Sequence, residues 1–92
     1  MARFLMLGKY SSDAIKGISA DRTKKATAIV EKAGGKISSA YALLGSYDLA
    51  LVVDLPGIQD ALKVSVAMTK ITDVGFTTMP AITVEEFDKL MA

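Results

Sequence analysis

Two consecutive predicted β-strands with apolar residues on both faces constrain the fold of this chain most. They lie in the stretch Lys36–Asp54 as Ile37–Leu44 and Asp48–Asp54, with Gly45-Ser46 as a tight hairpin connection. The second strand reads LALVV after Asp48, with no polar position on either face. An antiparallel strand with one wet face would alternate apolar and polar residues. This pattern therefore predicts a sheet that is covered on both sides.

The first strand of the hairpin differs between its two predicted faces. Strict alternation places Ile37, Ser39, Tyr41 and Leu43 on one face. The other face carries the small residues Ser38, Ala40 and Ala42, followed by the larger Leu44. Small side chains let a helix or a second sheet approach closely.

Further periodic segments flank the hairpin. Strand patterns cover Phe4–Tyr10 and Val74–Ile82, with Pro80 marking an edge or irregular end. Helical patterns cover Asp21–Ala33, Ile58–Lys70 and Val84–Leu90, and a short helical turn spans Asp13–Ile18. In Ile58–Lys70 the apolar stripe is expected on Ile58, Ala61, Leu62, Ser65 and Thr69, with Val66 and Met68 widening it. Thr83 followed by Glu86 forms a capping box for the last helix.

The order of these segments is β, α, β, β, α, β and a terminal helix. That order predicts one α+β, ferredoxin-like domain over residues 1–92, with the helices on one face of a four-stranded antiparallel sheet. The other face would stay open although its residues are apolar. Pairing two sheets face to face would bury it, so we predict a two-fold homodimer.

Composition limits the function classes. The 92 residues carry 11 basic and 10 acidic side chains, and this balance argues against nucleic-acid binding through phosphate contacts. There is no Cys and no His, which removes disulfides, most metal sites and His or Cys catalysis, and no cofactor is expected. The apolar run near the first residue is too short for a membrane span. A cytoplasmic location is the default expectation.

The turn carries the motif Gly45-Ser46-Tyr47-Asp48, and with its frame it resembles the GYD domain family. The frame consists of Lys9-Tyr10, Arg22, Gly34-Gly35-Lys36, Tyr41, Leu55-Pro56, Ala81-Ile82-Thr83 and Glu85-Glu86-Phe87. The resemblance implies a dimeric α/β barrel, with a more distant likeness to effector-binding domains of leucine-responsive-type regulators. The chain departs from the family pattern at Gly75 and Pro80, where a basic residue is frequent, which weakens the case for an anionic ligand.

The motif has a structural and a functional interpretation. Structurally, Gly45 permits a positive φ, Asp48 accepts hydrogen bonds from turn amides, and Tyr47 covers the hydrophobic edge. Functionally, Tyr41, Gly45, Tyr47 and Asp48 are the candidate ligand-binding residues, at the rim of a cavity or subunit interface. Asp48 would then hold an amine or a ligand amide. No catalytic residue can be named.

We therefore expect a homo-oligomeric domain that binds a small molecule or serves as an oligomerisation module. The alternative is a cofactor-independent monooxygenase- or isomerase-like enzyme of the dimeric α/β-barrel type. A closed cavity lined by Tyr41, Tyr47 or Asp48 would favour a ligand or enzyme role. The partner is expected to be a second copy of the chain, as a dimer or in a larger ring, with neither nucleic acid nor a membrane involved.

Overall fold

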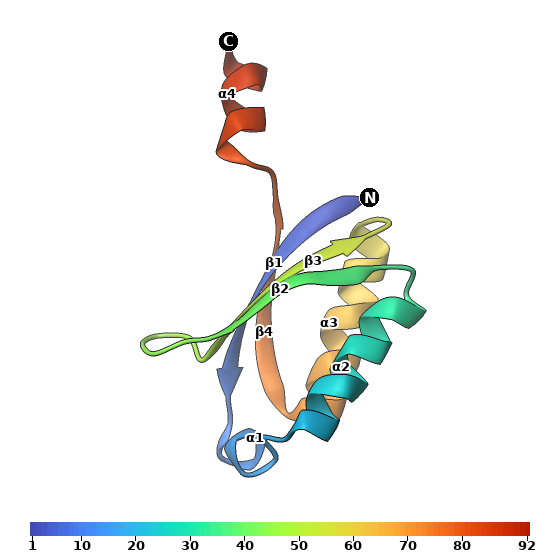
Figure 1. Ribbon diagram of the computed structural model, residues 1–92, viewed down its shortest axis with the longest axis vertical. Coiled ribbons are helices and arrows are strands. Elements are labelled where there is room, and N and C mark those ends of the chain that lie inside the picture. Colours follow the sequence, from blue (N-terminus) through green and yellow to red (C-terminus); the bar gives the residue numbers. More distant parts are fainter.

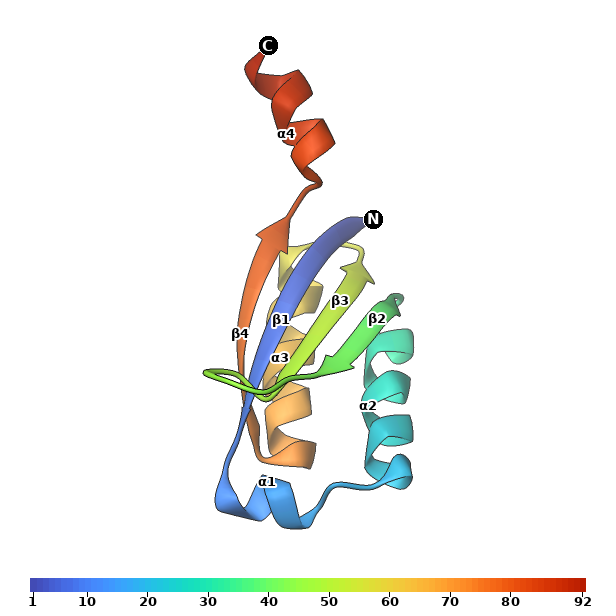
Figure 2. The same ribbon diagram turned by 60° about the vertical axis from the view of Figure 1, so that its left-hand side comes forward.

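Four antiparallel strands form one sheet in the order β2-β3-β1-β4, and two long helices lie on one side of it (Figures 1 and 2). The computed structural model describes residues 1–92. The strands are β1 (Ala2–Tyr10), β2 (Lys36–Ala42), β3 (Leu49–Leu55) and β4 (Val74–Ala81). The helices are α1 (Ser12–Lys16), α2 (Ala20–Lys32), α3 (Ile58–Thr72) and α4 (Val84–Met91). The predicted α+β ferredoxin-like arrangement with a terminal helix is confirmed.

The core lies between the sheet and the helices. Phe4 and Met6 of β1 and Val53 of β3 are almost fully buried there, because alternate residues of the central strands point toward α2 and α3. The core cluster comprises Phe4, Met6, Val30, Leu51, Val53, Leu55, Ala61, Val64 and Met68. Residues between them in sequence, such as Leu5 and Val52, point to the opposite side and are half-buried.

Local signals set the helix boundaries near the predicted positions. The Ser19 hydroxyl accepts a hydrogen bond from the Arg22 amide and starts α2. After α2 the chain turns at Gly34, whose φ of 86° lies in the left-handed region that glycine tolerates best. None of the helices is long and apolar enough to cross a membrane.

The buried stripe of α3 differs from the predicted one. Ala61, Val64, Met68 and Thr72 are buried, whereas Ile58 and Leu62 are each 64% exposed. The prediction was right for Ala61 and Met68 and wrong for Ile58 and Leu62, because α3 carries apolar residues nearly all the way round. Several stripes along the helix are then about equally apolar, and contact with the sheet determines which of them is buried.

The faces of β2 also differ from the prediction, because a β-bulge lies between Ile37 and Ser39. Ile37 pairs with Val53, but Ser39 pairs with Val52 and Tyr41 with Ala50. The extra residue shifts the alternation by one. Ile37 therefore faces the helices, while Ser39 and Tyr41 lie on the other side of the sheet.

The last helix, α4, stands apart from the rest of the domain. It continues beyond the end of β4 and projects away from the sheet and the other helices (Figures 1 and 2). None of its residues is buried. The predicted cap is present: the Thr83 hydroxyl oxygen accepts a hydrogen bond from the Glu86 amide at 3.1 Å. The chain measures 48 × 30 × 18 Å as a result of this projection.

Candidate functional site

The side of the sheet away from α2 and α3 is uncovered, and we call it the open face. Its apolar side chains come from all four strands: Leu5, Leu7, Tyr41, Ala50, Val52 and Met79. Tyr41 is 60% exposed and Met79 37% exposed. The predicted two-faced strands are therefore present, but within one chain only one face is buried.

The Gly45–Asp48 motif lies in a loop that is longer than predicted. β2 ends at Ala42 and β3 begins at Leu49, so six residues, 43–48, connect them in place of the two-residue hairpin turn. A hydrogen bond from the Leu43 amide to the Asp48 carbonyl, 2.8 Å long, holds the base of the loop. Gly45 adopts a φ of 136°, as expected of a glycine at such a position.

Asp48 ties this loop to the central strand β1. Its amide donates to the Gly8 carbonyl at 2.8 Å, and its carboxylate Oδ2 accepts from the Tyr10 amide at 2.8 Å. Lys9 Nζ adds a hydrogen bond to the Ser46 carbonyl at 3.1 Å. The carboxylate partner is thus a strand amide and not a turn amide, and the reason is that the longer loop folds back toward β1.

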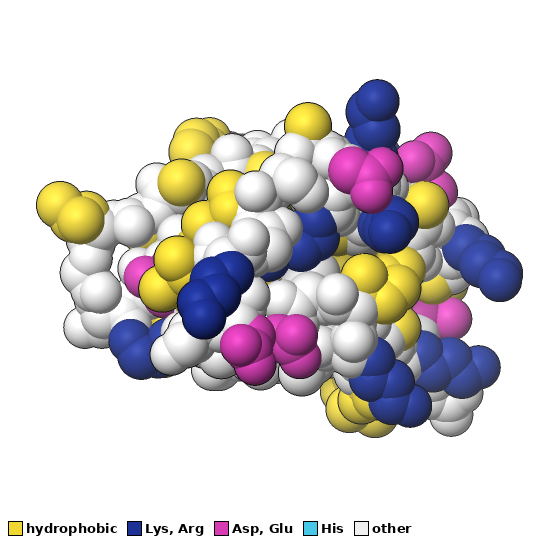
Figure 3. Space-filling view, turned by 90° about the horizontal axis from the view of Figure 1, so that it is seen from below, with side chains coloured by type: hydrophobic (Ala, Val, Ile, Leu, Met, Phe, Trp, Pro, Cys, Tyr) yellow, Lys and Arg dark blue, Asp and Glu magenta, His cyan; other side chains and the backbone are white.

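The structure places the four predicted site residues at one end of the sheet. Gly45, Tyr47 and Asp48 share the loop, and Tyr41 lies on the open face opposite Ala50. Gly45 is exposed, and Tyr47 and Asp48 are half-buried. Seen from the α1 end, hydrophobic side chains gather where the hairpin projects, and basic and acidic groups are interspersed elsewhere (Figure 3). The hollows described below are lined by other residues.

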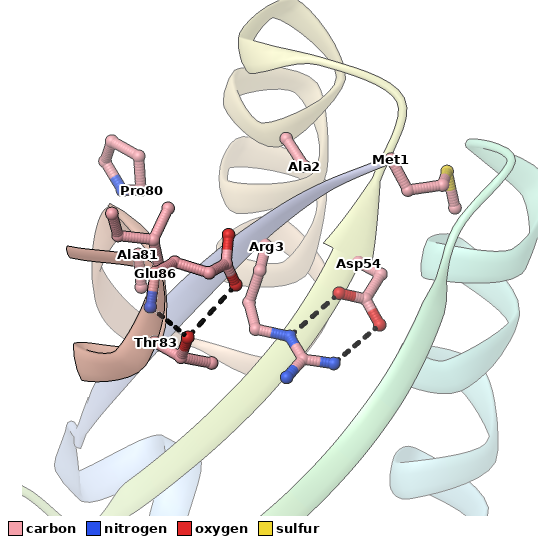
Figure 4. A pocket seen from close by; sticks show the side chains of 9 residues that line it. Met1, Ala2, Arg3, Asp54, Pro80, Ala81, Thr83 and Glu86 are labelled. Carbon is pink, nitrogen blue, oxygen red and sulfur yellow. Dashed lines mark hydrogen bonds and ion pairs between the residues drawn. The ribbon is translucent and has the colours of Figure 1, made fainter. Parts of the chain in front are cut away.

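A charged cluster lies at the opposite end of the open face. Arg3 Nε donates to Asp54 Oδ1 at 3.0 Å and Arg3 Nη2 to Oδ2 at 3.3 Å, which is a two-pronged contact (Figure 4). The Ser38 hydroxyl also donates to Asp54 Oδ2, at 2.6 Å. Ser38 lies on this face because it follows Ile37, which faces the helices. All buried side-chain polar atoms of the domain have partners.

These contacts hold Asp54 in its charged form. The hydrogen bond from Arg3, followed by the one from Ser38, lowers the pKa of Asp54 to about 2. The same hydrogen bond to Asp54 raises the pKa of the Arg3 guanidinium above its ordinary value. The pair remains ionised across the physiological pH range.

The cluster borders a hollow of about 580 Å³ between the strand ends and the base of α4 (Figure 4). Its lining consists of Met1, Ala2, Arg3, Asp54, Pro80, Ala81, Ile82, Thr83 and Glu86. Glu86 belongs to α4, and its carboxylate accepts a hydrogen bond from the Thr83 hydroxyl at 3.1 Å. The hollow offers fixed hydrogen-bonding groups, and the chain contains no cluster of three acidic side chains that could hold a metal ion.

A smaller hollow of about 160 Å³ lies between the sheet and the helices. Its lining is mostly apolar, with Tyr10 and Arg22 among its polar members. The Arg22 guanidinium lies 5.6 Å from the centre of the Tyr10 ring and donates to the Ala14 carbonyl. These contacts connect α2 to α1 and β1, so the two residues act in packing here.

Sequence reasoning did not identify the Arg3–Asp54–Ser38 cluster. In the sequence Arg3 stands alone as a single basic residue near the start of an apolar strand. The available signal was Asp54 itself, a carboxylate at the end of an otherwise apolar strand. Such a residue needs a charged or hydrogen-bonding partner when it is buried. The identity of that partner depends on strand register, which pairs Arg3 with Asp54 directly.

Comparisons with known proteins agree with this architecture. A crystal structure of the leucine response regulatory protein of Mycobacterium tuberculosis superposes with a TM-score of 0.59 at 10% identity. The match covers 89% of this chain and 51% of the regulator, so the chain spans about half the length of that protein, and the likeness concerns the fold. No curated protein matches the chain. The family model of the GYD domain matches residues 4–91, nearly the whole sequence, and the chain therefore belongs to the GYD domain family.

Proposed function

We propose that this domain is a homo-oligomerisation module that pairs two copies through their open faces, as a dimeric α/β barrel. The supporting observation is the open face itself. Leu5, Leu7 and Val52 form its centre on the two middle strands, and no element of the same chain covers them. Contiguous apolar patches of this kind on a single chain mark interaction sites.

The energetics favour association but leave a small margin. Burying about 300 Å² of apolar surface on each copy contributes about 15 kcal/mol at 25 cal/mol per Å². Association costs about 4–15 kcal/mol in lost rigid-body freedom, before side-chain ordering. Sheet pairing alone is therefore sufficient only for a moderate affinity, and contacts outside the open face decide how tight the dimer is.

A second candidate function, small-molecule binding, is supported by the hollow beside Arg3 and Asp54. Pairing of open faces would enclose this charged cluster between two sheets. A polar ligand could then bind where the side chains are already ordered. Tyr41, Gly45, Tyr47 and Asp48 remain the proposed ligand contacts at the other end of the face.

Two other predictions concern catalysis and cellular location. The alternative of a cofactor-independent enzyme gains no specific support, because the charged groups of the hollow, Arg3 and Asp54, are paired with each other. Residence in the cytoplasm stays a prediction.

Sedimentation velocity over a range of protein concentrations tests the homodimer. Two chains of 9.7 kDa give about 19 kDa for the expected species. Leu5→Glu should shift it toward monomer, because a charge would be buried at the centre of the paired faces. The matched control is Ile15→Glu, at a site that is 58% exposed on α1, away from the open face. It should sediment as wild type.

A monomeric wild-type protein at 100 μM would overturn the proposal. So would a Leu5→Glu variant that keeps the wild-type mass and far-ultraviolet circular dichroism. A mass that is a higher multiple of the dimer mass would support assembly and would indicate further contacts beyond the open face.

A further inference from the structure

The terminal helix α4 is amphipathic, and its apolar side is largely exposed. Val84, Phe87, Leu90 and Met91 fall within about 120° of the helix circumference, at 100° per residue. Their exposed fractions are 74%, 50%, 70% and 68%. The remaining positions carry Glu85, Glu86, Asp88 and Lys89. A helix of eight residues is not stable by itself in water, so this stripe needs a surface to pack on.

A matching apolar surface lies elsewhere on the chain. Ile58, Leu62 and Val66 form an exposed ridge along α3, at 64%, 64% and 55% exposure. Between this ridge and the edge strand β4 runs a groove, with Phe4, Ile58, Ala61, Leu62, Ser65, Thr78 and Pro80 as its lining. At 1.5 Å per residue, the ridge is about 12 Å long and the α4 stripe about 11 Å.

We propose that α4 of one copy packs into the α3–β4 groove of a second copy, and that the two copies exchange these helices. The inference rests on the proposed homodimer and adds the contacts that sheet pairing leaves open. Spacings of i and i+4 on α3 provide the ridge against which a second helix packs. Exchange makes the contact isologous, as a two-fold dimer requires.

The geometry of the linker argues against docking on the chain's own groove. Only Ile82 and Thr83 separate β4 from α4. In both views α4 points away from the sheet (Figures 1 and 2). The Thr83 cap is formed with the helix in this direction. Folding back onto the chain's own groove would require the chain to reverse direction within those two residues. Docking on a second copy requires no such reversal in the chain that carries the helix.

Charge argues for a protein surface over a lipid surface. Residues 84–91 carry three acidic groups and one basic group, a net charge of −2. The whole chain has a net charge of +1, so residues 1–83 carry +3. Membrane-surface helices are rich in Lys and Arg on their polar side, whereas the polar side of α4 carries three acidic residues and a single Lys. A second copy presents both the opposite net charge and an apolar groove.

The apolar area that α4 exposes is also large enough for a stable interface between two copies. Four side chains that are half to three-quarters exposed amount to on the order of 400 Å² on each α4. Two exchanged helices and their grooves, added to paired open faces, reach the 1,200–2,000 Å² that stable interfaces bury.

Engineered cysteines test the exchange directly, because the natural chain has no Cys. Phe87→Cys and Leu62→Cys are prepared as separate variants, one with a mass tag, then mixed, re-equilibrated and oxidised mildly. A disulfide-linked product of mixed mass is expected. In the control mixture, Phe87→Cys is combined with Ile15→Cys, which lies on α1 away from the groove, and this mixed product should be at least tenfold less abundant.

A second measurement keeps the inference testable if crosslinking geometry is poor. Deletion of residues 84–92 removes no buried residue, so the remaining domain should stay folded, with its circular dichroism reduced only by the signal of the eight deleted helical residues. Its dimer dissociation constant should rise at least tenfold. Leu90→Asp should give a similar rise, whereas Lys89→Ala on the opposite side of α4 should change the constant less than twofold.

The outcomes separate the two proposals. A wild-type dimer with neither the mixed disulfide nor an effect of deletion overturns helix exchange and leaves the sheet-paired dimer standing. A disulfide within the double variant Leu62→Cys/Phe87→Cys as a single chain also overturns it. A monomeric wild type overturns both. Crosslinking of α4 to an unrelated protein added as carrier would show non-specific adhesion and overturn the specific exchange.

Discussion

Replacing Asp48 with alanine tests whether the motif carboxylate holds the β2–β3 loop on β1. In the structure this carboxylate accepts a hydrogen bond of 2.8 Å from the Tyr10 amide. Asp48→Ala leaves the amide without its partner at a half-buried position. The loop would then be held to β1 by the Asp48 backbone and the Lys9 side chain.

The expected loss follows from the kind of hydrogen bond. A bond to a charged acceptor contributes about 1.5–3 kcal/mol when well shielded. Because Asp48 is half-buried, water can partly replace it, and we expect about 1–2 kcal/mol. For a domain of this length, that corresponds to a fall in Tm of roughly 4–16 °C. Asp48→Asn retains an acceptor oxygen and should lose less than half as much.

Urea unfolding followed by circular dichroism measures this free energy. Wild type and both variants are compared at one protein concentration, because association with a second copy would add to the apparent stability. The slopes with urea should agree among the three proteins. The reasoning would be refuted by Asp48→Ala within 0.5 kcal/mol of wild type, or by Asp48→Asn losing as much as Asp48→Ala.

Three further predictions concern the core, the backbone and pH. Gly35→Ala should destabilise the domain by more than about 2 kcal/mol, because the added Cβ would lie 2.2 Å from the Asp54 carbonyl oxygen. The control is Gly75→Ala, whose Cβ would have no atom within 4 Å and which should stay within about 0.5 kcal/mol of wild type in the same urea assay. Equal effects of the two substitutions would contradict this prediction. Met6→Ala should lower the free energy of unfolding by about 2–5 kcal/mol, because Met6 is fully buried. Thermal unfolding measures this loss, and a clearly smaller loss would contradict the prediction. Since the folded-state pKa of Asp54 is lowered to about 2, its stabilising contribution is present above pH 4 and is lost as the pH falls toward 2. The difference in unfolding free energy between wild type and Asp54→Asn should therefore shrink between pH 4 and pH 2. A difference that stays constant over this range would disprove the prediction.

Much of the fold was predictable because strong local signals agree with the tertiary structure. Ser19, Gly34 and Thr83 mark helix boundaries through hydrogen bonds or backbone conformations that depend on neighbouring residues only. Alternation in β1 and β3 grouped the residues that share a face, but both faces are apolar, so the sequence did not predict which of them packs against the helices. The βαββαβ order follows from these elements, and the sheet confirms it.

The candidate site was less predictable because it depends on register and on irregularities. The motif predicted a glycine-dependent turn, but the loop is six residues long and Asp48 binds an amide 38 positions earlier in the sequence. The cluster of Arg3, Ser38 and Asp54 joins three strands. It exists because strand register sets Arg3 opposite Asp54 and places Ser38 beside the same carboxylate.

The sequence by itself determined the strand and helix order, the helix caps and the apolar character of both sheet faces. These properties are set by side-chain chemistry within a few residues. Only the tertiary structure decided which side of α3 is buried, how β2 presents its side chains and which groups meet at the ends of the open face. Each of these is a choice among locally equivalent options, and packing between distant segments selects one because only that option fills the core and satisfies its polar groups.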